Sequence, residues 1–382
     1  MNKLNLLIKK LCPNGVEYKT IKETVGLNRG SRLVKNQLSD KFEYEVYHGS
    51  KDTVLGKYNN FNAPANTTIV VNTGGIGGVK FIDKPFWCSD GSFWLGHCNS
   101  INDKFLYYCL AGYEEYFASK KRVGGVPTID RDVVESFKIP VPPLEVQCEI
   151  VHILDQFTLL TAELTSELTA RKEQYKYYRD ELFNFDSSIK KVKLQDVADI
   201  IDSLHQTPKY VAEGYSMIRV MDIKGTYICT DETLKVDEDT YKVFIKRYKP
   251  KFNDIIVSRV GSFGNFSLVP NEDICLGQNI ALIKPNINYK YLYYYLNTPI
   301  VFEYLNSCAK GGSYKNIGIK DIVKIPVYIP SEQEQQRIVD ILDKFDTYCN
   351  DLTQGLPAEI ELRKQQYEYY RDKLLSFKEL KN

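Results

Sequence analysis

The side chains best suited to chemistry in this sequence are ones that form hydrogen bonds, and they stand in loops after strand-like runs. Arginine, asparagine and glutamine can each make paired hydrogen bonds to a planar edge such as that of guanine or adenine. Loops of this kind align between the two halves of the chain. The candidate base-contact residues are Arg29, Arg32, Asn72 and Thr73 in the first half and Gln206, Lys209, Ser258 and Arg259 in the second.

Basic residues flank paired glycines in both halves, at Gly124-Gly125 and at Gly311-Gly312. A run of charge is usually a solvated face. Basic residues beside a tight turn that occurs twice, however, suit contact with a phosphate backbone. The candidate backbone-contact residues are Lys121, Arg122, Lys310 and Lys315.

The sequence contains no set of residues at the spacing that catalytic or metal-binding motifs require. The four histidines form no evident set, and the nine cysteines lack Cys-x-x-Cys spacing. The glycine-rich run at 74–78 fails the phosphate-binding pattern Gly-x-x-x-x-Gly-Lys-Ser/Thr, so a tight turn is favoured there. The Asn/Asp-Pro-Pro-Tyr/Phe loop of an amino-methyltransferase is also absent. The sequence therefore predicts a chain with no catalytic residues, metal or cofactor of its own, and an enzyme is the disfavoured alternative.

The chain contains an internal duplication. Residues 171–180, Arg-Lys-Glu-Gln-Tyr-Lys-Tyr-Tyr-Arg-Asp, return at 363–372 as Arg-Lys-Gln-Gln-Tyr-Glu-Tyr-Tyr-Arg-Asp. Residues 150–157 also match 338–345, and 104–110 match 290–296. Such a repeat indicates two copies of one structural unit and a pseudo-two-fold molecule.

Each half ends in a stretch with helical periodicity. Apolar residues recur at spacings of three and four from Ile150 to Leu182, which predicts a helix over about 147–183 with a coiled-coil seam. Pro142-Pro143 gives this helix a sharp start. In the second copy the pattern breaks at Gly355-Leu356-Pro357, so we expect either a stutter or two helices. The tyrosines of the repeated motif fall on the seam, and packing is favoured for them over base stacking.

The fold class that follows is mixed α/β. We expect two similar globular domains at 1–138 and 189–324, with helical regions at 139–188 and 325–382. The two helical regions should pair as long antiparallel helices that form a coiled coil. This arrangement alternates a variable globular part with a shared helical part.

Charge follows the same division. The whole chain has a formal net charge of +1. The globular parts hold 19 basic against 14 acidic residues and 19 against 15, whereas the helical parts hold 4 against 9 and 8 against 11. Basic domains on acidic helices are compatible with domains on phosphate and helices held off it. Apolar runs stay short of the roughly 18 residues of a membrane span, and scattered cysteines suit a reducing cytoplasm.

Together these features resemble the specificity subunit of type I restriction–modification systems. The resemblance rests on the repeated Arg-Lys-x-Gln-Tyr-x-Tyr-Tyr-Arg-Asp element, on Gly124-Gly125 and on Ile139-Pro140-Val141-Pro142-Pro143 before the first helix. It covers nearly the whole chain. The second junction, at 325–333, departs from it by two extra residues and by the loss of the double proline.

The resemblance implies a non-catalytic subunit that reads a bipartite target in double-stranded DNA, one half with each domain. It also implies two methyltransferase subunits, which use S-adenosylmethionine, and endonuclease/translocase subunits. Glu163 and Glu167 on the first helix are candidate docking residues, with a solvated face as the other interpretation. Two further alternatives are a DNA-reading subunit of another bipartite-site methyltransferase or nuclease system, and a coiled-coil scaffold without a DNA role.

Overall fold

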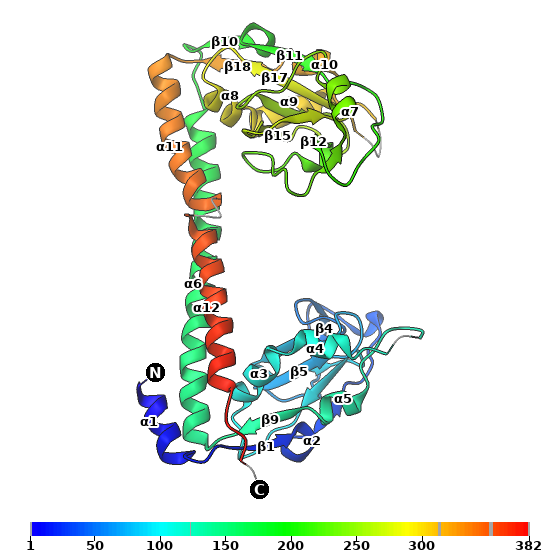
Figure 1. Cartoon of the computed structure of the whole chain (residues 1–382), viewed down its shortest axis with the longest axis vertical. Helices are drawn as coiled ribbons and strands as arrows, with labels where there is room; N and C mark the ends of the chain where they lie inside the picture. The colour runs from blue at the N-terminus through cyan, green and yellow to red at the C-terminus, as the bar shows by residue number, and fades with distance from the viewer. Residues whose placement is uncertain (1, 123, 312–314, 351–353, 381–382) are drawn as a thin grey trace. The chain divides into compact units, whose positions relative to one another are not determined.

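The chain folds into two compact units (Figure 1). The computed structural model describes residues 2–122, 124–311, 315–350 and 354–380, so Gly312 of the second glycine pair lies outside the described residues. Unit 1 consists of Met1–Thr165 with Glu359–Asn382, and unit 2 of Ser166–Ala358.

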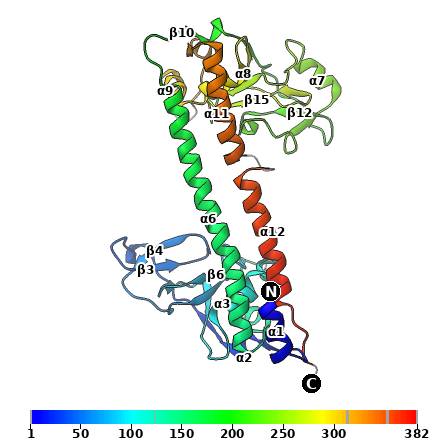
Figure 2. The ribbon, with the colours of Figure 1, turned by 90° about the vertical axis from the view of Figure 1, so that its left-hand side faces the viewer.

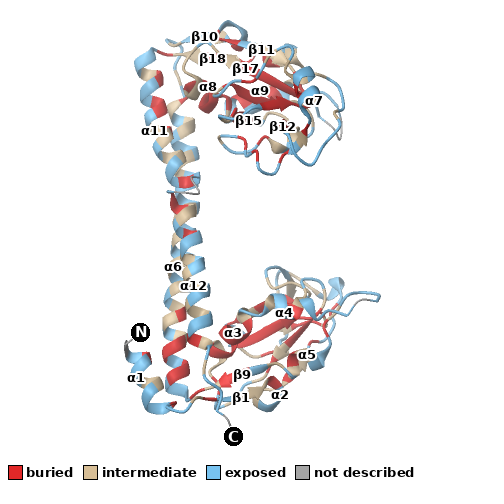
Figure 3. Ribbon diagram, in the orientation of Figure 1, coloured by how far each residue is buried: buried red, intermediate tan, exposed pale blue. Residues whose placement is uncertain are grey.

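The core of each unit is a four-stranded antiparallel sheet. In order across the sheet, the strands are β2 (Leu27–Arg29), β8 (Ser92–Leu95), β5 (Thr67–Val71) and β6 (Val79–Ile82) in unit 1, and β11 (Ala198–Asp202), β17 (Ile280–Pro285), β14 (Ile255–Ser258) and β15 (Phe266–Leu268) in unit 2. The inner strands β5 and β14 are buried at every residue, including Thr67 and Thr68 of β5 and Ser258 of β14. Figure 3 shows buried residues concentrated in these sheets and in the helices beside them.

A three-stranded sheet accompanies each core. Its strands are β4 (Val54–Tyr58), β3 (Tyr44–Tyr47) and β7 (Trp87–Cys88) in unit 1, and β13 (Leu234–Val236), β12 (Tyr215–Ile218) and β16 (Ile274–Leu276) in unit 2. In both sheets the middle strand runs antiparallel to the first strand and parallel to the last. Two-stranded ladders complete the pattern: β1 (Glu17–Thr20) with β9 (Lys138–Val141), and β10 (Lys190–Lys193) with β18 (Pro326–Ile329). The identical orders confirm the predicted duplication and the mixed α/β class.

Short helices follow the strands in the same sequence in both units. They are α3 (Asp103–Ala111), α4 (Glu114–Ser119) and α5 (Arg131–Glu135) in unit 1, and α8 (Tyr289–Leu296), α9 (Pro299–Cys308) and α10 (Ile319–Ile322) in unit 2. Asn102 and Asn288 cap α3 and α8, each accepting hydrogen bonds from two backbone N–H groups. The remaining short elements are α1 (Asn2–Leu11), α2 (Ile21–Thr24), α7 (Glu238–Phe244) and the single 3-10 turns Lys35–Gln37, Leu194–Asp196 and Val220–Asp222.

The helical regions differ in continuity. Helix α6 (Leu144–Leu182) has 39 residues and spans about 58 Å at 1.5 Å per residue. It begins directly after Pro142-Pro143, as predicted. The second region forms two helices, α11 (Glu332–Asn350) and α12 (Leu356–Leu375). Pro357 lies in the first turn of α12, where its missing N–H costs no helical bond, so the two-helix interpretation is confirmed.

Two helices pack antiparallel within each unit, as Figures 1 and 2 show. In unit 1, Phe157 of α6 stacks on Tyr370 of α12 with ring centroids 5.3 Å apart. In unit 2, Tyr178 of α6 stacks on Phe345 of α11 at 5.7 Å. The predicted antiparallel coiled coil and the packing role of the seam tyrosines are therefore confirmed.

The repeated helical motif is exchanged between the units. Its first copy, 171–180, lies in unit 2, where Tyr175 packs against the core. Its second copy, 363–372, lies in unit 1, where Tyr367 packs against the core. Each globular region is thus closed by the motif from the other half of the sequence, because the long helix α6 leaves unit 1 before it ends.

The same three side chains join each globular part to its long helix. The two sets are Lys104, Tyr108 and Asp155 in unit 1 and Lys290, Tyr294 and Asp343 in unit 2. The lysine and the tyrosine both bond to the aspartate, and the tyrosine hydroxyl lies 2.6 Å from the carboxylate in unit 1 and 2.7 Å in unit 2. Burial raises the pKa of both tyrosine hydroxyls, which keeps them protonated as donors. These contacts explain why the residues are repeated in the sequence.

Candidate nucleic-acid interface

The loops that hold many of the predicted residues occupy equivalent places in the two units. The β5–β6 loop follows the inner strand of unit 1, and the β14–β15 loop follows that of unit 2. The carbonyl of Asn72 accepts a hydrogen bond from Ile129 at 3.0 Å, and that of Arg259 accepts one from Ile317 at 2.9 Å. The shared bond shows that the two loops are equivalent, but it pairs Asn72 with Arg259, whereas the sequence alignment paired Asn72 with Ser258, so the alignment is wrong by one residue.

A short hairpin lies against each loop and carries the predicted backbone-contact residues. Arg122 donates its N–H to the carbonyl of Thr128 at 2.8 Å in unit 1. Lys310 and Asn316 exchange two such bonds, of 3.0 and 2.9 Å, in unit 2. The exposed basic side chains of the two hairpins are those of Lys121, Arg122, Lys310 and Lys315. Both hairpins therefore offer positive charge beside the aligned loops.

Glycines shape these turns. Gly124, Gly125 and Gly311 have φ values of 143°, 85° and 103°, a region that residues with a Cβ rarely adopt. In the β5–β6 loop, a Cβ on Gly74 would lie 2.5 Å from the carbonyl oxygen of Gly49. The glycine-rich run is thus a tight turn in close backbone contact, which agrees with the interpretation favoured from the sequence.

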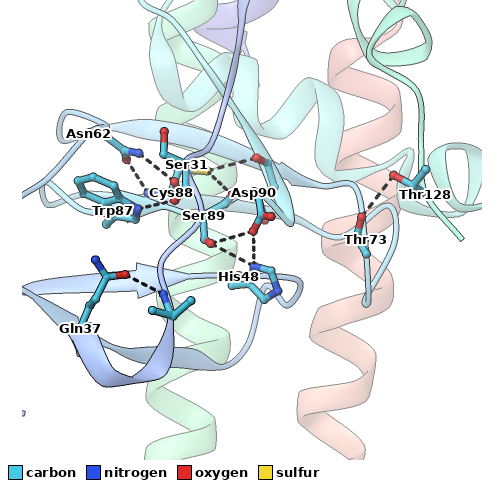
Figure 4. Close-up of polar contacts among 12 residues, drawn as sticks. Ser31, Gln37, His48, Asn62, Thr73, Trp87, Cys88, Ser89, Asp90 and Thr128 are labelled. Atoms are coloured by element: carbon cyan, nitrogen blue, oxygen red, sulfur yellow. Dashed lines mark hydrogen bonds and ion pairs between the residues drawn. The ribbon is translucent and has the colours of Figure 1, made fainter. Parts of the chain in front are cut away.

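Unit 1 presents two arginines from a fixed backbone. Arg29 ends β2 and Arg32 lies in the loop after it; both are exposed, and neither has a polar partner among the described residues. Between them, Ser31 donates its N–H to the carbonyl of Cys88 at 2.9 Å and accepts a bond from the Trp87 indole at 2.7 Å (Figure 4). Because the backbone between them is held, ligand binding by these two guanidinium groups must order the side chains but little of the loop.

The strand behind the arginines is fixed as well. The side chain of Asn62 bonds to both backbone groups of Cys88, at 2.7 and 2.9 Å (Figure 4). Gly30 packs directly on this strand, since a Cβ there would lie 2.0 Å from the carbonyl oxygen of Ser89. Gly30 also donates its N–H to the carbonyl of Ser92 at 3.2 Å. Only glycine fits at this position.

Three predicted contact residues point inward. Asn72 is buried, and its side-chain oxygen has no hydrogen-bond partner among the described residues. The hydroxyl of half-buried Thr73 lies 3.3 Å from that of Thr128 (Figure 4). Ser258 is fully buried and donates its hydroxyl to the carbonyl of Ser262 at 2.6 Å. In this conformation the three side chains shape the loops, and contact with a base requires them to turn outward.

Arg259 forms an internal ion pair with Asp202. Its Nε also donates to the carbonyl of Ile317 at 3.2 Å, and only 15% of its side chain is exposed. Asp202 is the last residue of β11, the position that Arg29 holds at the end of β2. At the end of the equivalent edge strands, unit 1 therefore has the positive charge of Arg29 and unit 2 the negative charge of Asp202.

The accessible predicted residues of unit 2 lie on the loop after β11. Gln206 and Lys209 are exposed there. The loop is tied to the segment after β16, because Gln278 donates its amide N–H to the hydroxyl of Thr207 at 3.0 Å. Unit 2 thus offers an amide and an ammonium group where unit 1 offers two guanidinium groups.

One position in each unit was not predicted. The parallel pairings of β3 with β7 and of β12 with β16 place His48 and Arg219, the residues after β3 and β12, at equivalent points. His48 Nδ1 lies 3.2 Å from Ser89 Oγ and 3.3 Å from Asp90 Oδ1 (Figure 4). Both contacts use one nitrogen, whereas a catalytic relay uses both ring nitrogens, so this cluster is not a Ser-His-Asp triad. Local spacing carries no signal for it, because 41 residues separate His48 from Ser89.

The helices present the repeated motif outward in the same way in both copies. Tyr177 is 62% exposed and its counterpart Tyr369 is 60% exposed. Of the predicted docking residues, Glu163 is exposed. Glu167 is half-buried, with carboxylate contacts of 3.4 Å to both Arg171 and the Tyr348 hydroxyl.

In the parts of the chain that the structure describes, no group of three or more histidine, cysteine, aspartate and glutamate side chains is arranged to hold a metal ion. Within the same residues, no helix is long and apolar enough to span a bilayer.

Comparison with known proteins gives consistent matches. A family model described as type I restriction modification DNA specificity domain matches residues 13–173 and 187–362. The chain is 30% identical over 409 residues to the type I restriction enzyme EcoR124I/EcoR124II specificity subunit of Escherichia coli, covering 99% of this chain and 98% of that protein. It is 29% identical over 398 residues to a putative type I restriction enzyme specificity subunit of Haemophilus influenzae, covering 98% and 99%.

Solved structures share the fold. The S subunit of a type I restriction–modification system from M. genitalium matches with a TM-score of 0.58 at 18% identity, over 94% of this chain and 96% of that one. A chain from a study of complex assembly and conformational transition in a type I system matches with a TM-score of 0.61 at 16% identity, over 95% and 98%.

Proposed function

Because the chain belongs to the type I restriction–modification DNA specificity family, we propose that each of its two units reads one half of a bipartite target in double-stranded DNA. The observation that carries this proposal is the repeated frame. Strand order, loop bonds and basic hairpins are the same in both units, while the side chains at matched positions differ. A repeated frame with different side chains suits a target made of two different half-sites.

The exposed residues are the proposed base readers. Arg29 and Arg32 act in unit 1, and Gln206 and Lys209 act in unit 2, because these side chains are accessible in the free protein. The other predicted readers contact bases only after their loops open. The basic hairpins contact phosphates and fix the register, with Lys121, Arg122, Lys310 and Lys315 as the contact residues.

Partner subunits supply the chemistry in this proposal. Two methyltransferase subunits, which use S-adenosylmethionine, dock on the helices, and endonuclease/translocase subunits complete the complex. Two copies of one partner are supported by the matched exposure of Tyr177 and Tyr369 in the repeated motif. The chain itself is non-catalytic, in keeping with the one-nitrogen geometry at His48. It acts in the cytoplasm, where its target lies.

Methylome sequencing of the host with and without the gene tests the reading proposal. A bipartite methylated motif that disappears with the gene is the expected result. Sites of another form, or an unchanged methylome, count against it. A scaffold without a DNA role predicts no change in the motif at all.

Co-purification tests the docking proposal. We expect the double charge reversal Glu163→Lys and Glu167→Lys to reduce recovery of the methyltransferase subunits. Glu213→Lys, an exposed acidic residue on a loop of unit 2, is the matched control and should leave recovery unchanged. Equal recovery with all variants indicates a merely solvated helix face.

A further inference from the structure

The corner of unit 2 that matches the His48 cluster of unit 1 is hollow. A pocket of about 440 Å³ opens there, beside Arg219 and between the ends of β12, β14 and β16. Its walls include Tyr210, Val220, Met221, Val260 and Gln278. Unit 1 has polar side chains, with His48 held by Ser89 and Asp90, at the same point.

A missing backbone contact explains the cavity. In unit 1, Gly75 donates its N–H to the carbonyl of Gly49 at 2.8 Å, so the β5–β6 loop closes on the strand end. In unit 2 the residue matching Gly49 is Val220, and among the described residues its carbonyl accepts no such bond from the β14–β15 loop. A Cβ on Gly261 of that loop would meet nothing within 4 Å. The same loop is therefore closed in unit 1 and open in unit 2.

The lining combines an apolar wall with the partly engaged amide of Gln278. Val220, Val260 and Met221 provide the wall, and Met221 is 60% exposed. Gln278 gives one N–H to Thr207, which leaves its carbonyl oxygen and its second N–H available. An A·T base pair shows the matching groups in the major groove: an acceptor and a donor on adenine, and a methyl group on thymine.

Positive charge borders the pocket. Gly261 donates its N–H to the carbonyl of Lys315 at 3.2 Å, and Val260 pairs with Asn316 of the basic hairpin. The ammonium groups of Lys310 and Lys315 are exposed on this hairpin. A ligand that reaches the pocket while its anionic backbone rests on the hairpin suits both features.

We propose that this pocket reads one A·T base pair in the half-site of unit 2, with Gln278 on the adenine and Val260 and Met221 against the thymine methyl group. The inference rests on the proposed function. It adds that unit 2 distinguishes an A·T base pair by a pocket that unit 1 lacks. Unit 1 has no apolar wall at the matching point, where Thr73 stands in place of Val260 and Asp90 in place of Gln278.

Removal of single methyl groups from the DNA tests the proposal. Duplexes carrying the methylated motif are made with each thymine replaced in turn by deoxyuridine, which lacks only the methyl group. Binding is measured with the full chain in complex with its co-purifying methyltransferase subunits. We expect about fourfold weaker binding for one thymine in the half-site of unit 2, the factor that loss of one buried methyl group corresponds to. Thymines in the half-site of unit 1, which is identified by its response to Arg29→Ala, should show no such dependence.

Protein variants locate the effect. Val260→Thr keeps the shape and should bring the thymine-to-uracil ratio close to one. Met221→Ala should also lower the ratio, and because Met221 is exposed, we expect the change to have little effect on folding. Val243→Thr makes the same chemical change on exposed α7 and should keep the ratio at about four.

Two negative outcomes are distinguishable. Sequence-specific binding with no uracil effect in that half-site, or with an effect that Val260→Thr leaves intact, overturns the pocket proposal alone. Loss of all sequence preference in the unmodified complex overturns the proposed function and this inference together.

Discussion

The strand ends that carry the proposed reading residues have the same backbone arrangement in both units but differ in their side chains. At the end of the edge strand, unit 1 has the free arginine Arg29, whereas unit 2 has Asp202, which neutralises Arg259. At the neighbouring corner, unit 1 has the His48 cluster, whereas unit 2 has an apolar pocket. The shared bonds run through main-chain atoms, so side chains at the strand ends can change without loss of the frame. If these side chains read bases as proposed, specificity and stability depend on different atoms of the same loops.

Among the variants that test the difference between the two units, Gly30→Ala should have the largest effect. The new Cβ would lie 2.0 Å from the carbonyl oxygen of Ser89, so the loop or the strand must move. We expect about 3 kcal/mol of destabilisation, measured by chemical denaturation. The matched position in unit 2 is Ser203, which accepts a bond from the N–H of Ile280 at 3.3 Å. Ser203→Ala should cost only about 1 kcal/mol, and equal costs at both positions would contradict the asymmetry.

Asp202→Ala should produce the next largest effect. It leaves the mostly buried guanidinium of Arg259 without its counter-ion. Because Asp202 itself is 32% exposed, we expect about 2 kcal/mol and not the full cost of a deeply buried charge. The double variant Asp202→Ala with Arg259→Met should recover much of this loss in a double-mutant cycle. Additive losses would show that the ion pair has no coupling.

Arg29→Ala should leave stability unchanged and alter recognition. The side chain has no polar partner among the described residues, so its removal breaks no internal bond. If it reads a guanine edge, preference at one position should fall by about 1–2 kcal/mol while the half-site of unit 2 stays intact. Motif sequencing of the variant complex measures this. Uniform weakening at every sequence would instead identify a phosphate contact.

Lys315→Gln should have the smallest effect and one without sequence dependence. Loss of one phosphate contact lowers the slope of log affinity against log salt concentration by about 1. Lys320→Gln, at an exposed residue of α10 outside the hairpin, is the matched control and should keep the slope. A change in the recognised motif would place Lys315 on a base edge.

Sequence patterns predicted the elements that repeat or run long. The helix after Pro142-Pro143, the seam tyrosines and the break before Pro357 follow from spacing that is local in the chain. The exchange of the helical motif between units could not be predicted, because the two copies have nearly the same sequence and no local feature indicates which core each one packs against.

The sequence predicted which loops and hairpins are repeated, while the contact of their residues with DNA stays a prediction. The aligned loops and basic hairpins lie where the sequence put them, and Arg29, Arg32, Gln206 and Lys209 are exposed. The ion pair of Arg259 and the cluster around His48 depend on strand pairings between residues 41 or more positions apart. Such non-local pairings leave no mark on neighbouring residues, so they could not be read from one sequence.

The exchanged motif also fixes the order in which the units can be completed during synthesis. Unit 2 is one continuous stretch, Ser166–Ala358, and has all its residues once that stretch has left the ribosome. Unit 1 starts first but lacks its closing helix until Glu359–Asn382 has been made. The apolar side chains around Leu154 therefore stay without their packing partner Leu374 while all of unit 2 is translated. Unit 1, whose synthesis begins first, is therefore the last unit that can complete its fold.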